Sequence, residues 1–126
     1  MGRFWIGVAL LMALLTLGFF AGTAMEQNHN RISDMLEQAA QSAAQGQLER
    51  GAALGRQAAD HWQQHRNATA AMADHAPMEE IDSLFAQLKI YETTGQADCF
   101  ATCSAKLSML VRAVGEAHSL SWWNLL

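Results

Sequence analysis

The hydrophobic residues of the chain are concentrated near its N-terminal end. Between Phe4 and Ala24 there is no Asp, Glu, Lys or Arg, whereas polar and apolar residues are mixed in the rest of the chain. As an α-helix, residues 4–24 would rise about 31 Å, which matches the hydrocarbon core of a bilayer. Such a helix satisfies its own backbone hydrogen bonds and can therefore cross lipid. The pattern predicts a transmembrane helix over residues 4–24.

A cleaved secretory signal is the alternative to this anchor. Residues 1–3 would then be its charged n-region, and residues 22–24 would be a small-residue cleavage site. The apolar segment is longer than the roughly 7–15 residues that are usual for a signal, which favours an uncleaved anchor. Arg3 precedes the segment, whereas Glu26 and Arg31 nearly cancel after it. The positive-inside rule then predicts a single-pass protein with residues 1–3 in the cytoplasm and the remainder outside.

Gly18 and Gly22 form a G-x-x-x-G pattern on one face of the predicted membrane helix. Small residues let two membrane helices approach closely, so this face is a candidate site for pairing with another helix. The alternative is that glycine is simply common in membrane helices.

Residues 25–119 contain four amphipathic stretches with the period of an α-helix, and no stretch alternates with the period of a strand. Short turns between them make sequential helices antiparallel neighbours. The sequence therefore predicts an all-α protein, in which an N-terminal transmembrane helix is followed by an antiparallel four-helix bundle built of two αα-hairpins. The first helix is expected to be capped at Asn28, Asn30 or Ser33 and to end at Gly46. The second is expected to run from Leu48 to about Ala73, and the third from Pro77 to Gly95. The fourth is expected to run from Phe100 to about His118.

The two predicted hairpins resemble each other in sequence. A shift of 49 residues lays Ile32 on Ile81 and Gly46 on Gly95, so each hairpin turns at a glycine. Ala-rich helices also align by chance, and the architecture does not require a duplication. The second helix contains small residues such as Gly55, which permit close approach by another helix of this chain or of a partner.

Composition narrows the class of function. Charged residues make up 16% of the chain, below the roughly 25% of a typical soluble domain, and the net charge is −4. A nucleic-acid partner is not expected, because nucleic-acid binders carry basic patches. Two Cys are too few for a disulfide scaffold. The part of the chain after residue 24 has 7 basic and 12 acidic residues, since Arg3 lies before it. This acidic part should be repelled by an anionic lipid surface and stand off from it.

Two pairs of residues at i, i+4 spacing are candidates for metal or redox chemistry. His61 and His65 can hold one metal ion from a single helix, with Asp74 and His75 nearby, but the H-E-x-x-H pattern is absent. Cys99 lies one turn before Cys103, a spacing at which helix geometry aims thiols poorly for a disulfide. We expect both Cys to be small buried hydrophobes. The sequence has no phosphate loop or nucleophile elbow either, so we expect no catalytic residue, no metal site and no cofactor.

An acidic group follows Pro77 at the start of the predicted third helix. Glu79, Glu80 and Asp82 are a candidate interaction surface, because they cluster within about one turn of the helix. Such carboxylates can also bind a cation or act as a carboxylate pair, and the favoured alternative is that they complement the helix dipole and face solvent.

The C-terminal tail, residues 120–126, is unusual because it places Trp122, Trp123 and two Leu at a chain end, where polar residues are normal. Three outcomes remain open for this tail. It packs back onto the bundle, it inserts at the membrane interface where Trp is favoured, or it fills a groove on a partner.

Three segments of the chain resemble a known family. They are RFWIGV at residues 3–8, ADHAPMEEIDSLF at residues 73–85 and WWNLL at residues 122–126. The chain is similar over its whole length to the small single-pass membrane proteins of spore-forming, Gram-positive bacteria that carry domain of unknown function 4363. The resemblance implies a protein of the bacterial cell membrane that works beside another membrane protein, with a link to sporulation. It implies no catalytic residues.

These observations favour a membrane-anchored scaffold or accessory subunit that acts through protein–protein interaction. Its expected partners are membrane lipid and either another membrane protein or a second copy. The expected interaction residues are Gly18, Gly22, Pro77, Glu79, Glu80, Asp82, Trp122 and Trp123. The alternatives are an extracytoplasmic ligand-sensing bundle, which predicts a sizeable polar-lined pocket, and a metal or redox protein that uses His61 with His65 or Cys99 with Cys103. Assembly instead predicts a filled core and an exposed apolar patch.

Overall fold

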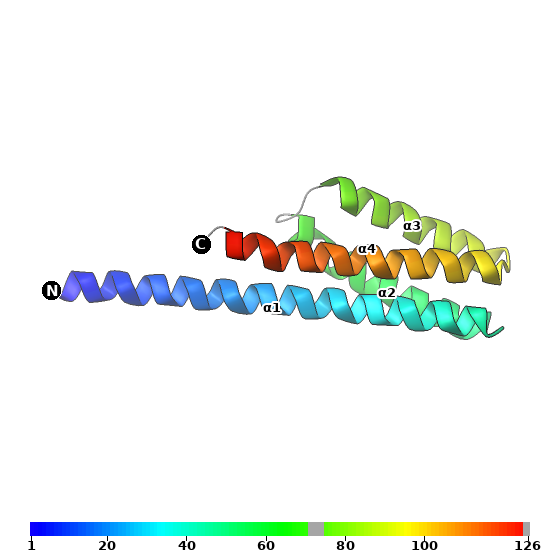
Figure 1. Cartoon of the computed structure of the whole chain (residues 1–126), viewed down its shortest axis with the longest axis horizontal. Helices are drawn as coiled ribbons and strands as arrows, with labels where there is room; N and C mark the ends of the chain where they lie inside the picture. Colours follow the sequence, from blue (N-terminus) through cyan, green and yellow to red (C-terminus); the bar gives the residue numbers. More distant parts are fainter. Residues whose placement is uncertain (71–74, 125–126) are drawn as a thin grey trace.

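The computed structural model describes the backbone of residues 1–70 and 75–124, and the side chains of these ranges apart from residues 75 and 118–124. Within these ranges the regular structure is entirely helical, which confirms the predicted all-α class (Figure 1). Four helices pack together as a bundle. They are α1 (Gly2–Ala44), α2 (Leu48–Ala70), α3 (His75–Thr93) and α4 (Ala97–Asn124).

The first helix is longer than the sequence pattern suggested. α1 is one continuous helix of 43 residues, about 65 Å long, so the apolar segment and the first bundle helix are a single element. The expected cap near Asn28 does not form. A side-chain cap is needed only where backbone N–H groups lack carbonyls four residues earlier, and here the apolar half of α1 supplies those carbonyls.

Both hairpins turn at the predicted glycines. Gly46 has φ +82° and Gly95 has φ +69°, the left-handed region in which glycine carries no steric cost. Each turn has the same pair of bonds, from Gly46 N–H to Ala43 O and from Gln47 N–H to Ser42 O in the first, and from the equivalent groups in the second. This is the Schellman end of a helix, repeated at a spacing of 49 residues. The prediction of two helical hairpins that each turn at a glycine is confirmed.

The four helices pack in a ring with one loose side. α1 packs against both α4 and α2, and α3 packs against α4, whereas α2 and α3 meet only sparingly. α4 lies along α1 and extends farther toward the N-terminal end of α1 than α2 or α3 does (Figure 1). The buried core contains large apolar side chains from all four helices, among them Ile32, Leu36, Trp62, Met78, Ile81, Phe100, Leu107 and Val111.

The small residues of α2 serve packing within the chain. A Cβ at Gly51 would lie 2.7 Å from the carbonyl oxygen of Ala39. A Cβ at Gly55 would lie 3.3 Å from both Leu88 Cδ2 and Phe100 Cζ. Gly51 therefore lets α1 approach closely, and Gly55 makes room for the fully buried Phe100. At these two positions the helices that approach α2 therefore belong to the same chain.

The start of α3 differs slightly from expectation. The helix begins at His75, two residues before Pro77. Pro77 still lies in the first turn, where its missing N–H has no intrahelical partner to lose. The expected continuation of the second helix from Ala70 to Ala73 lies outside the described residues.

Candidate functional site

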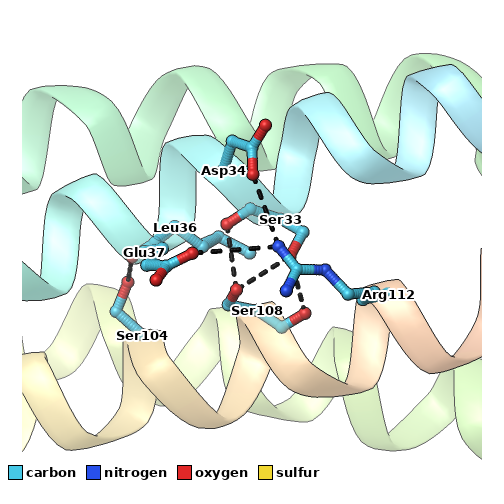
Figure 2. Close-up of polar contacts among 7 residues, drawn as sticks. All are labelled: Ser33, Asp34, Leu36, Glu37, Ser104, Ser108 and Arg112. Carbon is cyan, nitrogen blue, oxygen red and sulfur yellow. Dashed lines mark hydrogen bonds and ion pairs between the residues drawn. The ribbon is translucent and has the colours of Figure 1, made fainter.

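Three buried serines join α1 to α4. Ser33 Oγ donates to the Ser108 carbonyl oxygen at 2.9 Å, and Ser108 Oγ donates back to the Ser33 carbonyl oxygen at 3.0 Å. One turn away, Ser104 Oγ donates to the Leu36 carbonyl oxygen at 2.6 Å. Figure 2 shows this ladder of hydroxyls between the two backbones. Each of these three hydroxyls is hydrogen-bonded, so the polar groups cost little to bury.

The two helices also approach closely at the next contact along the same interface. A Cβ at Gly115 of α4 would lie 2.9 Å from His29 Cβ, so only glycine fits there. His29 is buried, and its Nδ1 lies 2.7 Å from the Met25 carbonyl oxygen. We call the residues Ser33, Leu36, Ser104 and Ser108 together with the His29–Gly115 contact the α1–α4 seam. Small residues at facing positions are the device by which membrane helices pack.

An exposed charge group borders the α1–α4 seam. Arg112 lies 3.4 Å from Asp34 and 3.8 Å from Glu37 (Figure 2). All three side chains are largely exposed, so each ion pair contributes about 0–1 kcal/mol. The seam is therefore held by its buried packing and its serine hydrogen bonds more than by charge.

Asp82 links α3 to α2 and does not face outward with its acidic neighbours. Trp62, which is 1% exposed, donates its indole N–H to Asp82 Oδ1 at 2.8 Å. Arg66 Nε donates to Asp82 Oδ2 at 2.8 Å, and this hydrogen bond raises the pKa of the Arg66 guanidinium above its ordinary value. The Trp62 ring also stacks on Phe85 and meets His29 edge-on. The Trp62–Asp82–Arg66 cluster thus joins α2 to α3 across the side of the bundle where these two helices meet only sparingly.

The other members of the predicted acidic surface are exposed. Pro77, Glu79 and Glu80 all face solvent at the start of α3. Glu80 lies 3.9 Å from Lys106 of α4 across an exposed pair. The structure therefore separates the acidic group into Asp82, which is used within the fold, and an outer pair at Glu79 and Glu80.

Gly18 and Gly22 stand out within the apolar half of α1. Both are partly covered, whereas the large side chains from Phe4 to Phe20 are exposed. α1 is also the one described helix that is long and apolar enough to cross a membrane, and its apolar window is wholly exposed. The side chains of Trp122 and Trp123 lie outside the described residues.

The candidate metal and redox pairs lie on α2 and α4. Among the residues that the structure describes, no three His, Cys, Asp or Glu side chains are grouped to hold a metal ion. His65 Nδ1 lies 2.8 Å from the His61 carbonyl oxygen, within its own helix. The candidate partners Asp74 and His75 lie outside the described side chains.

The two cysteines have different environments. Cys103 is buried, and its thiol donates to the Leu84 carbonyl oxygen at 3.3 Å. Burial raises the pKa of Cys103, which keeps it protonated. Cys99 is exposed, so the expectation of burial is correct for Cys103 and wrong for Cys99. The reason is geometric, because Cys99 lies at the edge of the apolar stripe of α4, one turn before a residue at its centre.

The described residues line two open clefts on the surface of the bundle. One, of about 320 Å³, lies between α2 and α3 over Leu88 and Phe100, and the exposed ion pair of Arg56 with Glu92 borders it. The other, of about 340 Å³, lies between α3 and α4 beside Cys99. Within the described part, the exposed large hydrophobic residues outside the apolar half of α1 are Ile90 and Met109. The exposed apolar patch that assembly predicts is therefore not found among the described side chains of the bundle, and the exposed apolar surface lies on the apolar half of α1 instead.

Fold and seam together define a class of protein. It is an all-helical bundle whose first helix begins with a long, exposed apolar half. Small residues pack the first helix closely against the last one. A family model described as "Domain of unknown function (DUF4363)" matches residues 19–125. The chain therefore belongs to this family. No curated protein and no solved structure matches the chain.

Proposed function

We propose that the protein is a membrane-anchored helical scaffold, an accessory subunit of a bacterial membrane complex that acts through protein–protein contact and catalyses no reaction. Its anchor is residues 4–24, with residues 1–3 in the cytoplasm and the bundle outside. The observation that carries the proposal is the continuity of α1. The same helix exposes an apolar half and buries its other half in the bundle core.

Continuity of α1 has a mechanical consequence. A helix that runs unbroken from lipid into a packed core fixes the height and the tilt of the bundle above the membrane. The α1–α4 seam and the α1–α2 packing then transmit that position to the rest of the bundle. Presenting a rigid surface at a fixed height is what a scaffold requires.

The surface that we assign to a partner is formed by Pro77, Glu79 and Glu80. These residues are exposed, and they lie at the end of the bundle that faces the apolar half of α1 (Figure 1). A second membrane protein, or another copy of this chain, would meet this edge close to the lipid surface. A role in sporulation is a finer part of the proposal, which rests on the family resemblance.

Site-specific photocrosslinking in native membranes tests the proposal. A photoreactive residue replaces Glu79 in one variant and Gln45, in the exposed turn at the opposite end of the bundle, in a matched control. We expect a crosslink from position 79 to an integral membrane protein or to a second copy, and none from position 45. Monomer alone from both positions, at the native level of expression, would refute the scaffold.

The cleft between α2 and α3 favours a second candidate, which is a ligand-sensing bundle. Its volume of about 320 Å³ is at the lower end of the range for small-molecule sites. Its floor is apolar and its border is charged, so an amphiphilic ligand would suit it. Ala59→Leu, which fills the cleft, would abolish ligand binding in this case and leave the crosslink from position 79 unchanged.

A further inference from the structure

The α1–α4 seam continues beyond the bundle into the apolar half of α1. On α1, the seam residues His29, Ser33 and Leu36 are spaced by four and three. The same heptad pattern reaches Gly22 seven residues before His29, and Gly18 four residues before that. The two glycines therefore lie on the face of α1 that packs against α4, and both are partly covered.

α4 extends far enough to lie beside these glycines. Its backbone remains helical to Asn124, and it passes the ends of α2 and α3 along α1 (Figure 1). Gly115 lies opposite His29, and antiparallel helices advance at the same rise. Seven residues onward from Gly115 is Trp122, and seven residues back from His29 is Gly22. The last turns of α4 are therefore level with Gly22, inside the predicted membrane segment.

The composition of this part of α4 suits that depth. After Glu116 the chain has no Asp, Glu, Lys or Arg. Gly22 is two residues inside the boundary at Ala24, a depth of about 3 Å at the rise of an α-helix. This is the interfacial zone, in which Trp is enriched.

We propose that the last turns of α4, residues 118–124, are embedded in the outer membrane–water interface beside α1, with Gly18 and Gly22 forming the face that receives them. The inference rests on the proposed anchoring of α1. In this arrangement the G-x-x-x-G pattern packs against α4 of the same chain. The tail lies in the interfacial zone of the bilayer. Past the ends of α2 and α3, the described neighbour of α4 is α1, so the remaining sides of the helix face lipid.

Depth-dependent quenching in vesicles tests this proposal. The purified full chain, with Cys99→Ser and Cys103→Ala, receives one new cysteine that carries an environment-sensitive fluorophore. The test position is Ser121→Cys. Leu14→Cys, exposed at the centre of the apolar half, is the control for lipid, and Gln47→Cys, in the distal turn, is the control for water. The vesicles contain phosphatidylcholine and phosphatidylglycerol with a nitroxide at a shallow or a deep position of the acyl chain.

We expect the label at position 121 to be quenched most strongly by the shallow nitroxide, that at position 14 by the deep one, and that at position 47 by neither. A label at position 121 that behaves like the one at position 47 would overturn the inference, because the tail would then lie in water. Blue-shifted emission at position 121 without quenching would also overturn it, since the tail would be covered by protein. Failure of quenching at position 14 would instead refute the membrane anchor itself.

A second variant tests the role assigned to the glycines. Gly22→Leu should change the ratio of shallow to deep quenching at position 121, because a large side chain displaces the last turns of α4 from α1 and alters their depth. Gly7→Leu is the matched control, since a Cβ at Gly7 meets nothing within 4 Å. Equal quenching in both variants would refute the assignment of Gly22 to the α4-facing side.

Discussion

Removing the carboxylate of Asp82 should destabilise the bundle, although the sequence places this residue in an acidic surface cluster. In Asp82→Ala, the buried Trp62 N–H loses its acceptor, and Arg66 loses its ion pair. A buried donor left unsatisfied costs about 1–3 kcal/mol. For a bundle of roughly 100 residues, each kcal/mol lowers Tm by about 4–8 °C.

The assay is thermal unfolding of the full chain in detergent micelles, followed by circular dichroism. Glu79→Ala is the matched control, because Glu79 is an exposed acid one turn earlier on the same helix. Asp82→Asn should fall between the two, since the amide oxygen still accepts from Trp62 but the charge opposite Arg66 is gone. If Asp82→Ala unfolds at the same temperature as Glu79→Ala, the assignment of Asp82 to the α2–α3 contact is wrong.

Three further predictions concern the α1–α4 seam and the cysteines. Gly115→Leu should cost about 1–3 kcal/mol, because the new side chain would overlap His29, and Tm should fall accordingly; a Tm equal to that of Gly7→Leu would contradict the close approach. An alkylating reagent at neutral pH should modify Cys99 in the folded chain and spare Cys103, as fragmentation by mass spectrometry of the one tryptic peptide that contains both would show; rapid modification of both would contradict the burial of Cys103. Burial raises the pKa of Cys103, so the folded chain holds this proton more tightly than the unfolded chain does. The resulting stability is fully present below the ordinary thiol pKa, and it is lost as the pH rises from that value through the higher pKa of the folded chain.

The elements of the fold were predictable because each has a local signal. Hydrophobic periodicity marks the helices, and a glycine at positive φ marks each hairpin turn. The joint between the apolar segment and the bundle was not predictable from caps. Asn28 and Ser33 are good capping residues, but a preceding helical turn removes the need for a cap, and nothing in the local sequence interrupts that turn.

The polar contacts between helices were beyond the reach of periodicity. Ser33 and Ser108 are 75 positions apart, and each is an ordinary helix residue until the other helix faces it. Asp82 is likewise indistinguishable from Glu79 and Glu80 in sequence, and only its register against Trp62 sets it apart. A signal was present for Gly115, because an isolated glycine within a helical stripe indicates either a cost or a close contact.

The central claim is that the apolar half of α1 remains attached and carries the bundle at the membrane. The most direct measurement is the intact mass of the mature chain, taken from membranes that have been washed with alkaline carbonate. We expect a chain that retains residues 4–24 and sediments with the membranes. A chain that begins near Met25 and is recovered from the soluble fraction would contradict the account.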